Sequence, residues 1–218
     1  MRYERKYQIT HLSKYAIEQA VRLHPAGFRK IFPNRQINNI YFDTLDYQTC
    51  LQNIEGVNQR KKYRLRWYGT DLQQIKQPRF EVKIKHNELG RKETIPFPNH
   101  DLSNLKTITQ QVNQLKVENY STPLLALSPT LLNTYQRSYF GTSDGKFRIT
   151  VDWDLQFYAP LHQNTFQQYP SNSQQVVLEL KYEENYDTLA PIILNYLPFR
   201  QTKSSKYVTG VLMRNSNF

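Results

Sequence analysis

Residues 60–67 alternate in a way that strongly limits how the chain can fold. If this stretch is a β-strand, one face carries Arg60, Lys62, Arg64 and Arg66, and the other carries Lys61, Tyr63, Leu65 and Trp67. Four like charges on one face repel one another and call for an anion to neutralise them. We call these four residues the basic row and interpret it as half of a polyanion site.

The same alternation recurs in other predicted strands. One face of each carries Arg2, Glu4 and Lys6; Glu81, Lys83 and Lys85; Arg148, Thr150, Asp152 and Asp154; Val177, Glu179 and Lys181; or Tyr135, Arg137 and Tyr139. In a single strand this pattern is typical of a solvated outer face. The chain also contains amphipathic helices, which need an apolar surface to pack on. We therefore expect the apolar faces to point outward under helices and the charged faces to line an interior.

The predicted elements favour an α+β fold that is mainly antiparallel β. Strands are predicted over 3–9, 37–43, 58–68, 79–86, 91–96, 134–141, 146–158 and 175–182, and helices over 13–23, 101–117, 186–197 and 203–214. Residues 143–146 (Ser-Asp-Gly-Lys) are typical of a hairpin turn. We expect one domain, 1–218, built as an eight-stranded closed tunnel barrel with a charged lumen and helices packed outside.

Composition narrows the choice of partner and setting. The net charge of +11 indicates an anionic partner. Cys50 is the only cysteine, so an intrachain disulfide and a thiolate zinc cluster are excluded, and a cytoplasmic location is expected. We expect no signal peptide, because the charged first residues are not followed by an apolar segment, and no run approaches the roughly 18 apolar residues of a spanning helix. A membrane role would then need a partner protein.

Carboxylates among the cations have two possible explanations. These carboxylates, Glu4, Glu81, Glu179 and Asp152, could form ion pairs, or they could bind Mg²⁺ or Mn²⁺ together with phosphate oxygens. A second basic cluster, Lys203 to Tyr207, is either the phosphate-binding start of a helix or an ordinary surface helix. Nucleic acid is not expected, because the alternation buries Tyr63, Leu65 and Trp67 away from the basic row.

Eight ordered blocks resemble a known family. They are Arg2-x-Glu4-x-Lys6, residues 39–44 (NIYFDT), 60–69 (RKKYRLRWYG), 80–83 (FEVK), Tyr135-x-Arg137, 148–152 (RITVD), 178–181 (LELK) and 204–207 (SSKY). Together they resemble the VTC (vacuolar transporter chaperone) domain. That domain is the polyphosphate polymerase branch of the triphosphate tunnel metalloenzymes, within the CYTH-like superfamily.

The resemblance implies transfer of the γ-phosphate of ATP to a polyphosphate or pyrophosphate acceptor. The phosphate-binding residues would be Lys6, Arg60, Lys62, Arg64, Arg66, Lys83, Lys85, Tyr135, Arg137, Arg148, Lys181, Lys203, Ser205 and Lys206. The residues implied in catalysis are Arg64, Arg66, Lys83, Arg137, Arg148 and Glu179, and the metal ligands would be Glu179 and Glu4, holding Mn²⁺ or Mg²⁺.

The chain departs from the wider superfamily at its first strand, where many members carry Glu-x-Glu-x-Lys. Arg2 replaces the first glutamate, which weakens the case for two-metal hydrolysis and favours the polymerase branch. Two alternatives stay open. One is a triphosphatase acting on inorganic, nucleotide or RNA 5′ triphosphates, and the other is a sensor that binds polyphosphate or nucleotide without turnover.

Overall fold

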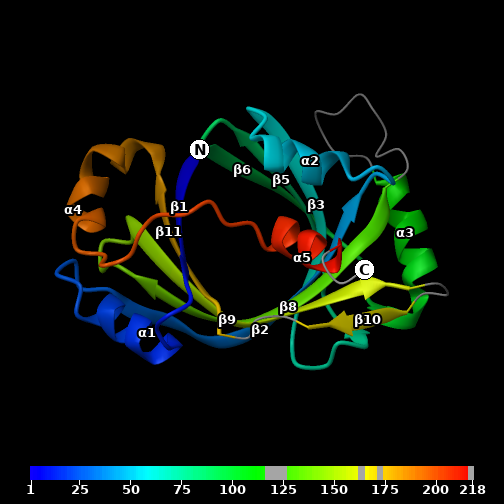
Figure 1. The fold of residues 1–218 in the computed structure, drawn as a ribbon, viewed down its shortest axis with the longest axis horizontal. Helices are drawn as coiled ribbons and strands as arrows, with labels where there is room; N and C mark the ends of the chain where they lie inside the picture. The colour runs from blue at the N-terminus through cyan, green and yellow to red at the C-terminus, as the bar shows by residue number, and fades with distance from the viewer. Residues whose placement is uncertain (116–126, 162–164, 171–173, 216–218) are drawn as a thin grey trace.

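The computed structural model describes residues 1–115, 127–161, 165–170 and 174–215 (Figure 1). Its strands are β1 (Arg2–Ile9), β2 (Arg29–Asp43), β3 (Gln59–Tyr68), β4 (Gln74–Ile75), β5 (Arg79–His86), β6 (Leu89–Pro96), β7 (His100–Asp101), β8 (Ser128–Gly141), β9 (Phe147–Pro160), β10 (Phe166–Tyr169) and β11 (Val176–Glu183). Its α-helices are α1 (Lys14–Arg22), α2 (Gln48–Glu55), α3 (Leu105–Gln114), α4 (Ala190–Leu194) and α5 (Lys206–Asn215), with short 3-10 helices at Leu102–Asn104 and Glu184–Leu189.

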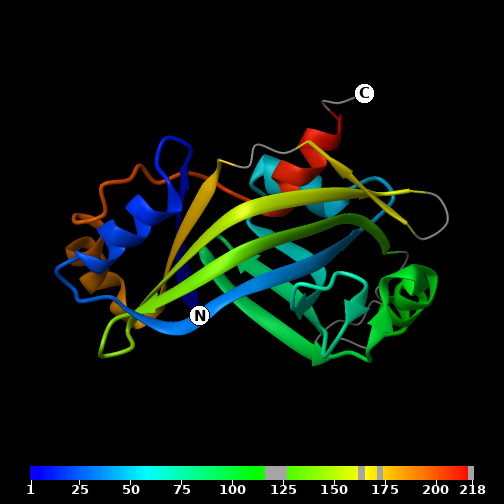
Figure 2. The ribbon, with the colours of Figure 1, turned by 90° about the horizontal axis from the view of Figure 1, so that it is seen from below.

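An antiparallel sheet forms the body of the molecule. Its strand order is β10-β9-β11-β1-β6-β5-β3-β2-β8, and β8 also pairs with β9. Eight strands therefore form a ring, and β10 extends from β9 outside it. β2, β8 and β9 run along much of the length of the molecule, as Figure 2 shows. The prediction of a mainly antiparallel α+β fold is confirmed.

Two predicted strands are longer than expected. β2 begins at Arg29 instead of residue 37, and β8 begins at Ser128 instead of residue 134. The first seven residues of β2 are exposed and show no apolar alternation, so their extended conformation depends on pairing with β8. The predicted helix 101–117 is a 3-10 turn followed by α3, and its residues 116 and 117 lie outside the described residues.

Helix α2 was not predicted, because its first turn has no local capping residue. Tyr47 occupies the N-cap position with a left-handed backbone and no side-chain cap. Asp43, several residues earlier, supplies the missing acceptor: its carboxylate accepts hydrogen bonds from the backbone N–H groups of Thr49 (2.9 Å) and Cys50 (3.0 Å).

Three apolar clusters hold the helices to the ring. α1 and α4 pack with β1, β9 and β11, while α3 packs with β2, β3 and β5. α5 instead packs with Tyr41, Leu131 and Tyr135, and in Figure 1 it lies across the middle of the ring. The expectation that all helices pack outside is therefore wrong for α5. Among the helices that the structure describes, none is long and apolar enough to cross a membrane.

Candidate functional site

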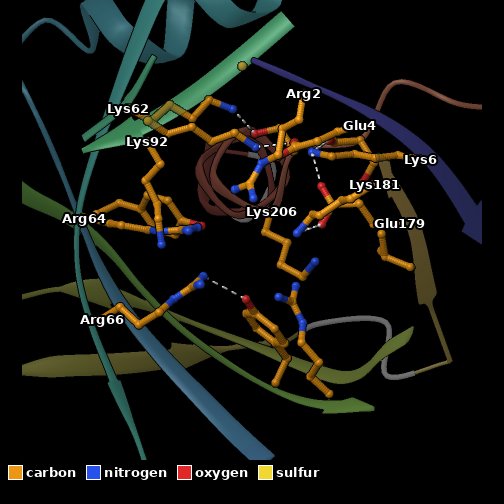
Figure 3. A pocket seen from close by; sticks show the side chains of 18 of the residues that line it. Arg2, Glu4, Lys6, Lys62, Arg64, Arg66, Lys92, Glu179, Lys181 and Lys206 are labelled. Atoms are coloured by element: carbon orange, nitrogen blue, oxygen red, sulfur yellow. Dashed lines mark hydrogen bonds and ion pairs between the residues drawn. The ribbon is translucent and has the colours of Figure 1, made fainter. Parts of the chain in front are cut away.

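Side chains from seven strands of the ring converge on one pocket. The lining residues are Arg2, Glu4, Lys6, Tyr41, Lys62, Arg64, Arg66, Lys83, Gly90, Arg91, Lys92, Tyr135, Arg137, Val177, Glu179, Lys181, Ser204, Ser205 and Lys206. We call this the central pocket; its volume is about 130 Å³. Figure 3 shows Arg64 and Arg66 on one side of it, facing Glu4, Lys6 and Glu179 on the other.

Most of the predicted site residues meet in this pocket, although they come from distant parts of the chain. Four do not line it: Arg60, Lys85, Arg148 and Lys203. Arg60 donates to the carbonyl of Val57 (2.7 Å), and Arg148 is exposed. The basic row is thus divided: Lys62, Arg64 and Arg66 line the pocket, and Arg60 lies beyond it.

Lys92 lines the pocket but was not predicted. Its strand was recognised, and Lys92 pairs in register with Lys83, so both side chains lie on the same face of the sheet. Extending the alternation of β5 across this hairpin would have identified it. Tyr41 and Ser204 also line the pocket. Both lie in blocks that resemble the family, but neither was assigned a role from the sequence.

Glu81 neutralises much of the basic row. Its carboxylate lies 2.6 Å from Arg64 Nη2, 2.6 Å from Lys92 Nζ and 3.8 Å from Arg66 Nη1. Burial opposes the charged form of Glu81, but Arg64, Arg66 and Lys92 hold its pKa well below the usual range. We expected the positive charges of the basic row to repel one another. For Arg64 and Arg66 this prediction is wrong, because a carboxylate from the neighbouring strand compensates their charge.

Asp152 forms a second buried cluster. Arg137 binds both of its carboxylate oxygens, at 2.5 and 2.7 Å, and Lys206 Nζ lies 2.6 Å from Oδ2. Burial favours the neutral acid, yet Arg137 and Lys206 lower the pKa of Asp152 to about 2. This carboxylate therefore ties β9 to β8 and to the start of α5.

Lys62 differs from its neighbours in the row. Its Nζ lies 2.7 Å from Ser205 Oγ, and it forms no ion pair with the carboxylates that the structure describes. Burial, together with the positive charges of Lys6, Lys83, Arg60 and Arg64, lowers the pKa of its ammonium well below the usual value. A bound anion is the natural counter-charge for this position.

Glu4 and Glu179 have the chemistry needed for a hard divalent cation. Glu4 pairs with Lys83, and Glu179 Oε2 lies 2.8 Å from Lys181 Nζ. Thr150 lies opposite Glu179 in register, and its Oγ1 is buried without a hydrogen-bond partner among the described residues. No group of three or more His, Cys, Asp or Glu residues in the described chain could enclose a metal. A metal here would take its other ligands from phosphate oxygens and water, as Mg²⁺ commonly does.

Several solved structures are similar to this chain, all at low sequence identity. A candidate adenylate cyclase from Vibrio parahaemolyticus is similar over 95% of this chain and 97% of its own, with 16% identity and a TM-score of 0.52. A Hippeastrum protein, described as a candidate adenylyl cyclase with a dominant triphosphatase activity, covers 99% and 96% at 14% identity and a TM-score of 0.48. The Schizosaccharomyces pombe Mediator head module covers 89% and 90% at 10% identity and a TM-score of 0.45. No curated protein matches the sequence.

The family is decided by the sequence. The VTC domain model matches residues 1–214, so the chain belongs to the VTC domain family. The resemblance drawn from the eight sequence blocks is thereby confirmed. Membership places the chain among the triphosphate tunnel enzymes and implies dependence on a divalent metal.

Proposed function

We propose that this protein is a metal-dependent polyphosphate polymerase that transfers the γ-phosphate of ATP to a polyphosphate or pyrophosphate acceptor. One observation carries the proposal: basic side chains from opposite walls of the ring converge on a single pocket. Clustered cations of this kind suit a chain of phosphates, in which each unit carries negative charge.

The phosphates would occupy the space between two groups of cations. One group consists of Lys62, Arg64, Arg66 and Lys83. The other consists of Lys6, Arg137, Lys181 and Lys206, and Ser205 and Tyr135 would be additional hydrogen-bond donors. Arg60, Lys85, Arg148 and Lys203, which do not line the pocket, would guide a longer chain outside it. In this proposal the interior of the ring is the charged lumen that the strand alternation predicts, and the phosphate chain would bind there.

Transfer needs positioning and charge stabilisation more than proton transfer. The bond between the γ-phosphorus and the β,γ-bridging oxygen breaks and ADP leaves, while a bond forms to the terminal oxygen of the acceptor. That oxygen is already ionised, so no general base is required. The cations from both walls would stabilise negative charge on the transferring group.

The metal would bind at Glu179, with Glu4 beside it, and would neutralise phosphate oxygens during transfer. Arg2 lines the pocket at the position where many members of the wider superfamily carry the first glutamate of Glu-x-Glu-x-Lys. A cation there supports binding of a phosphate chain over two-metal hydrolysis. We propose that the reaction takes place in the cytoplasm, where ATP is available. If the protein acts at a membrane, a membrane-protein partner would hold it there.

The direct test is product analysis with ATP and Mn²⁺ or Mg²⁺. We expect a ladder of polyphosphate lengths from the wild type. Arg66→Ala should lose most of this activity, and Arg29→Ala, at an exposed arginine outside the pocket, should retain it. Orthophosphate as the sole product would indicate a triphosphatase instead. Tight binding without turnover, unchanged in Glu179→Gln, would indicate a sensor.

A further inference from the structure

A cluster of aromatic rings surrounds one exposed arginine in the first half of β2. The guanidinium carbon of Arg35 lies 5.2 Å from the ring centroid of Phe32, 5.9 Å from that of Tyr68 and 5.8 Å from that of Tyr139. The rings of Phe32 and Tyr139 also meet edge to face, with centroids 5.7 Å apart. We call these four residues the aromatic cluster.

The cluster lies on the inward face of the ring, just past one end of the central pocket. Tyr68 is two residues beyond Arg66, and Tyr139 is two residues beyond Arg137, so each shares a face with its pocket residue. Arg35 lies opposite Arg137 in the register of β2 and β8. Three strands therefore continue from the pocket wall into the cluster.

A continuous series of contacts between cations and aromatic rings connects the central pocket with the aromatic cluster. Lys206 Nζ lies 4.7 Å from the ring centroid of Tyr135, and the guanidinium carbon of Arg137 lies 5.3 Å from the same centroid. Arg137 also lies 6.0 Å from the ring centroid of Tyr139, which is shared with Arg35. The contacts lead from the pocket to the surface.

The outermost rings are open to solvent. Phe32 is 48% exposed and Tyr68 is 46% exposed, whereas most rings of the fold's core are fully buried. Rings that served only to stabilise the fold would be expected to bury their faces. Exposed aromatic faces with an arginine beside them are the features that bind a nucleobase by stacking and cation–π contact.

The spacing suits a nucleotide. Two residues along a strand span roughly 7 Å, which is comparable with the reach of a ribose and its attached base beyond the α-phosphate. We propose that the aromatic cluster stacks the base of a nucleoside triphosphate whose α-phosphate lies near Arg66 and Arg137. This inference rests on the proposed function, and it fixes the direction in which the nucleotide enters the ring.

The test compares two ligands that differ in the nucleoside, ATP and inorganic tripolyphosphate. The affinity of each is measured by calorimetry for the wild type, for Tyr68→Ala and for Phe32→Ala. Each substitution should weaken ATP binding roughly tenfold, in the range for loss of a stacked base, and should change tripolyphosphate affinity less than twofold. Tyr15→Ala, at a tyrosine 73% exposed on α1, is the matched control and should change neither affinity. A 2-aminopurine nucleoside triphosphate should lose fluorescence on binding to the wild type and lose less on binding to Tyr68→Ala.

The outcomes separate the two proposals. If ATP and tripolyphosphate bind the wild type equally and neither variant affects ATP, the base makes no contact here and the inference is overturned, while the proposed function stands. Equal weakening of both probes would also overturn it, because the rings would then act through Arg137. Failure of the wild type to bind either probe would overturn the proposed function and this inference together.

Discussion

Three charged groups in or beside the central pocket differ in how their charge is compensated. Glu81 and Asp152 are surrounded by cations, and their negative charge is already satisfied in the empty protein. Lys62 has only a hydroxyl partner, Ser205. The basic residues therefore have different roles. The cations paired with carboxylates position the walls of the pocket, whereas the charge of Lys62 is compensated only when an anion binds.

Replacing Lys62 should expose a conflict between stability and binding. Lys62→Met removes a buried ammonium without a carboxylate partner, so we expect the empty protein to gain about 1–3 kcal/mol, a rise in Tm of roughly 2–12 °C. Tripolyphosphate affinity should fall at the same time. Thermal unfolding with and without tripolyphosphate measures both effects, and Lys30→Met on exposed β2 should produce neither. A lower Tm for Lys62→Met without ligand would contradict this account.

Asp152 should contribute to the acid sensitivity of the fold. Its pKa is about 2 in the folded protein, below its usual value of about 4, so its stabilising contribution is full above pH 4 and disappears as the pH falls towards 2. At pH 7, Asp152→Asn should cost about 3–5 kcal/mol, because Arg137 and Lys206 lose their counter-charge. Urea unfolding between pH 7 and 2 should show a shallower decline for the variant than for the wild type. Parallel curves would mean that Asp152 does not titrate with folding.

At the scale of elements, a buried contact set around Tyr207 helps to hold α5 in the ring. The Tyr207 hydroxyl lies 2.6 Å from Asp43 Oδ2 and 3.1 Å from Thr130 Oγ1, and its ring stacks on Tyr41. Asp43 also caps α2, so the two helices share one anchor. Ser205 and Lys206 immediately precede Tyr207, and their position in the pocket depends on this anchor.

Tyr207→Phe should therefore affect binding although the hydroxyl does not line the pocket. We expect a loss of about 1–3 kcal/mol of stability, because Asp43 loses a buried donor, and weaker tripolyphosphate binding. Denaturant unfolding and calorimetry measure the two effects. Tyr158→Phe is the control: its hydroxyl donates to Gln156 (2.9 Å), away from α5, and affinity should not change. Wild-type affinity in Tyr207→Phe would show that the other contacts of α5, including the Lys206–Asp152 ion pair, are sufficient to position it.

At the scale of the whole molecule, the extent of strand pairing differs between parts of the ring. β2 and β8 pair along nearly their full length, whereas β1 and β6 pair only at Arg2 and Gly90. The Glu4–Lys83 ion pair reaches across this seam from β1 to β5. Because the pocket contains side chains from both sides of the seam, a bound polyanion would connect its two edges.

Hydrogen exchange should reveal this closure. We expect tripolyphosphate to slow amide exchange in β1 and β6 more than in β2 and β8, whose hydrogen bonds already protect them. Binding should also raise Tm, since the ligand binds only the folded ring. The same measurement with sulfate controls for general ionic effects. Uniform slowing in all eight strands of the ring would indicate global stabilisation without closure of the seam.

Several features could be predicted before the structure was known, because they depend on local periodicity. Alternation assigned Lys62, Arg64 and Arg66 to one face, and the family blocks identified most of the pocket. The first half of β2 and helix α2 could not be predicted. The extended conformation of the first depends on pairing with β8, and the cap of the second comes from Asp43 across a turn.

Side-chain alternation has a period of two, and this is a property of each strand that can be read without knowing its neighbours. It was sufficient to separate inward from outward faces and to indicate a polyanion site. Which carboxylate compensates which cation depends on register and ring closure, which join residues far apart in the chain. Tertiary structure alone placed Glu81 beside Arg64, brought Lys206 to Asp152 and assembled the aromatic cluster around Arg35.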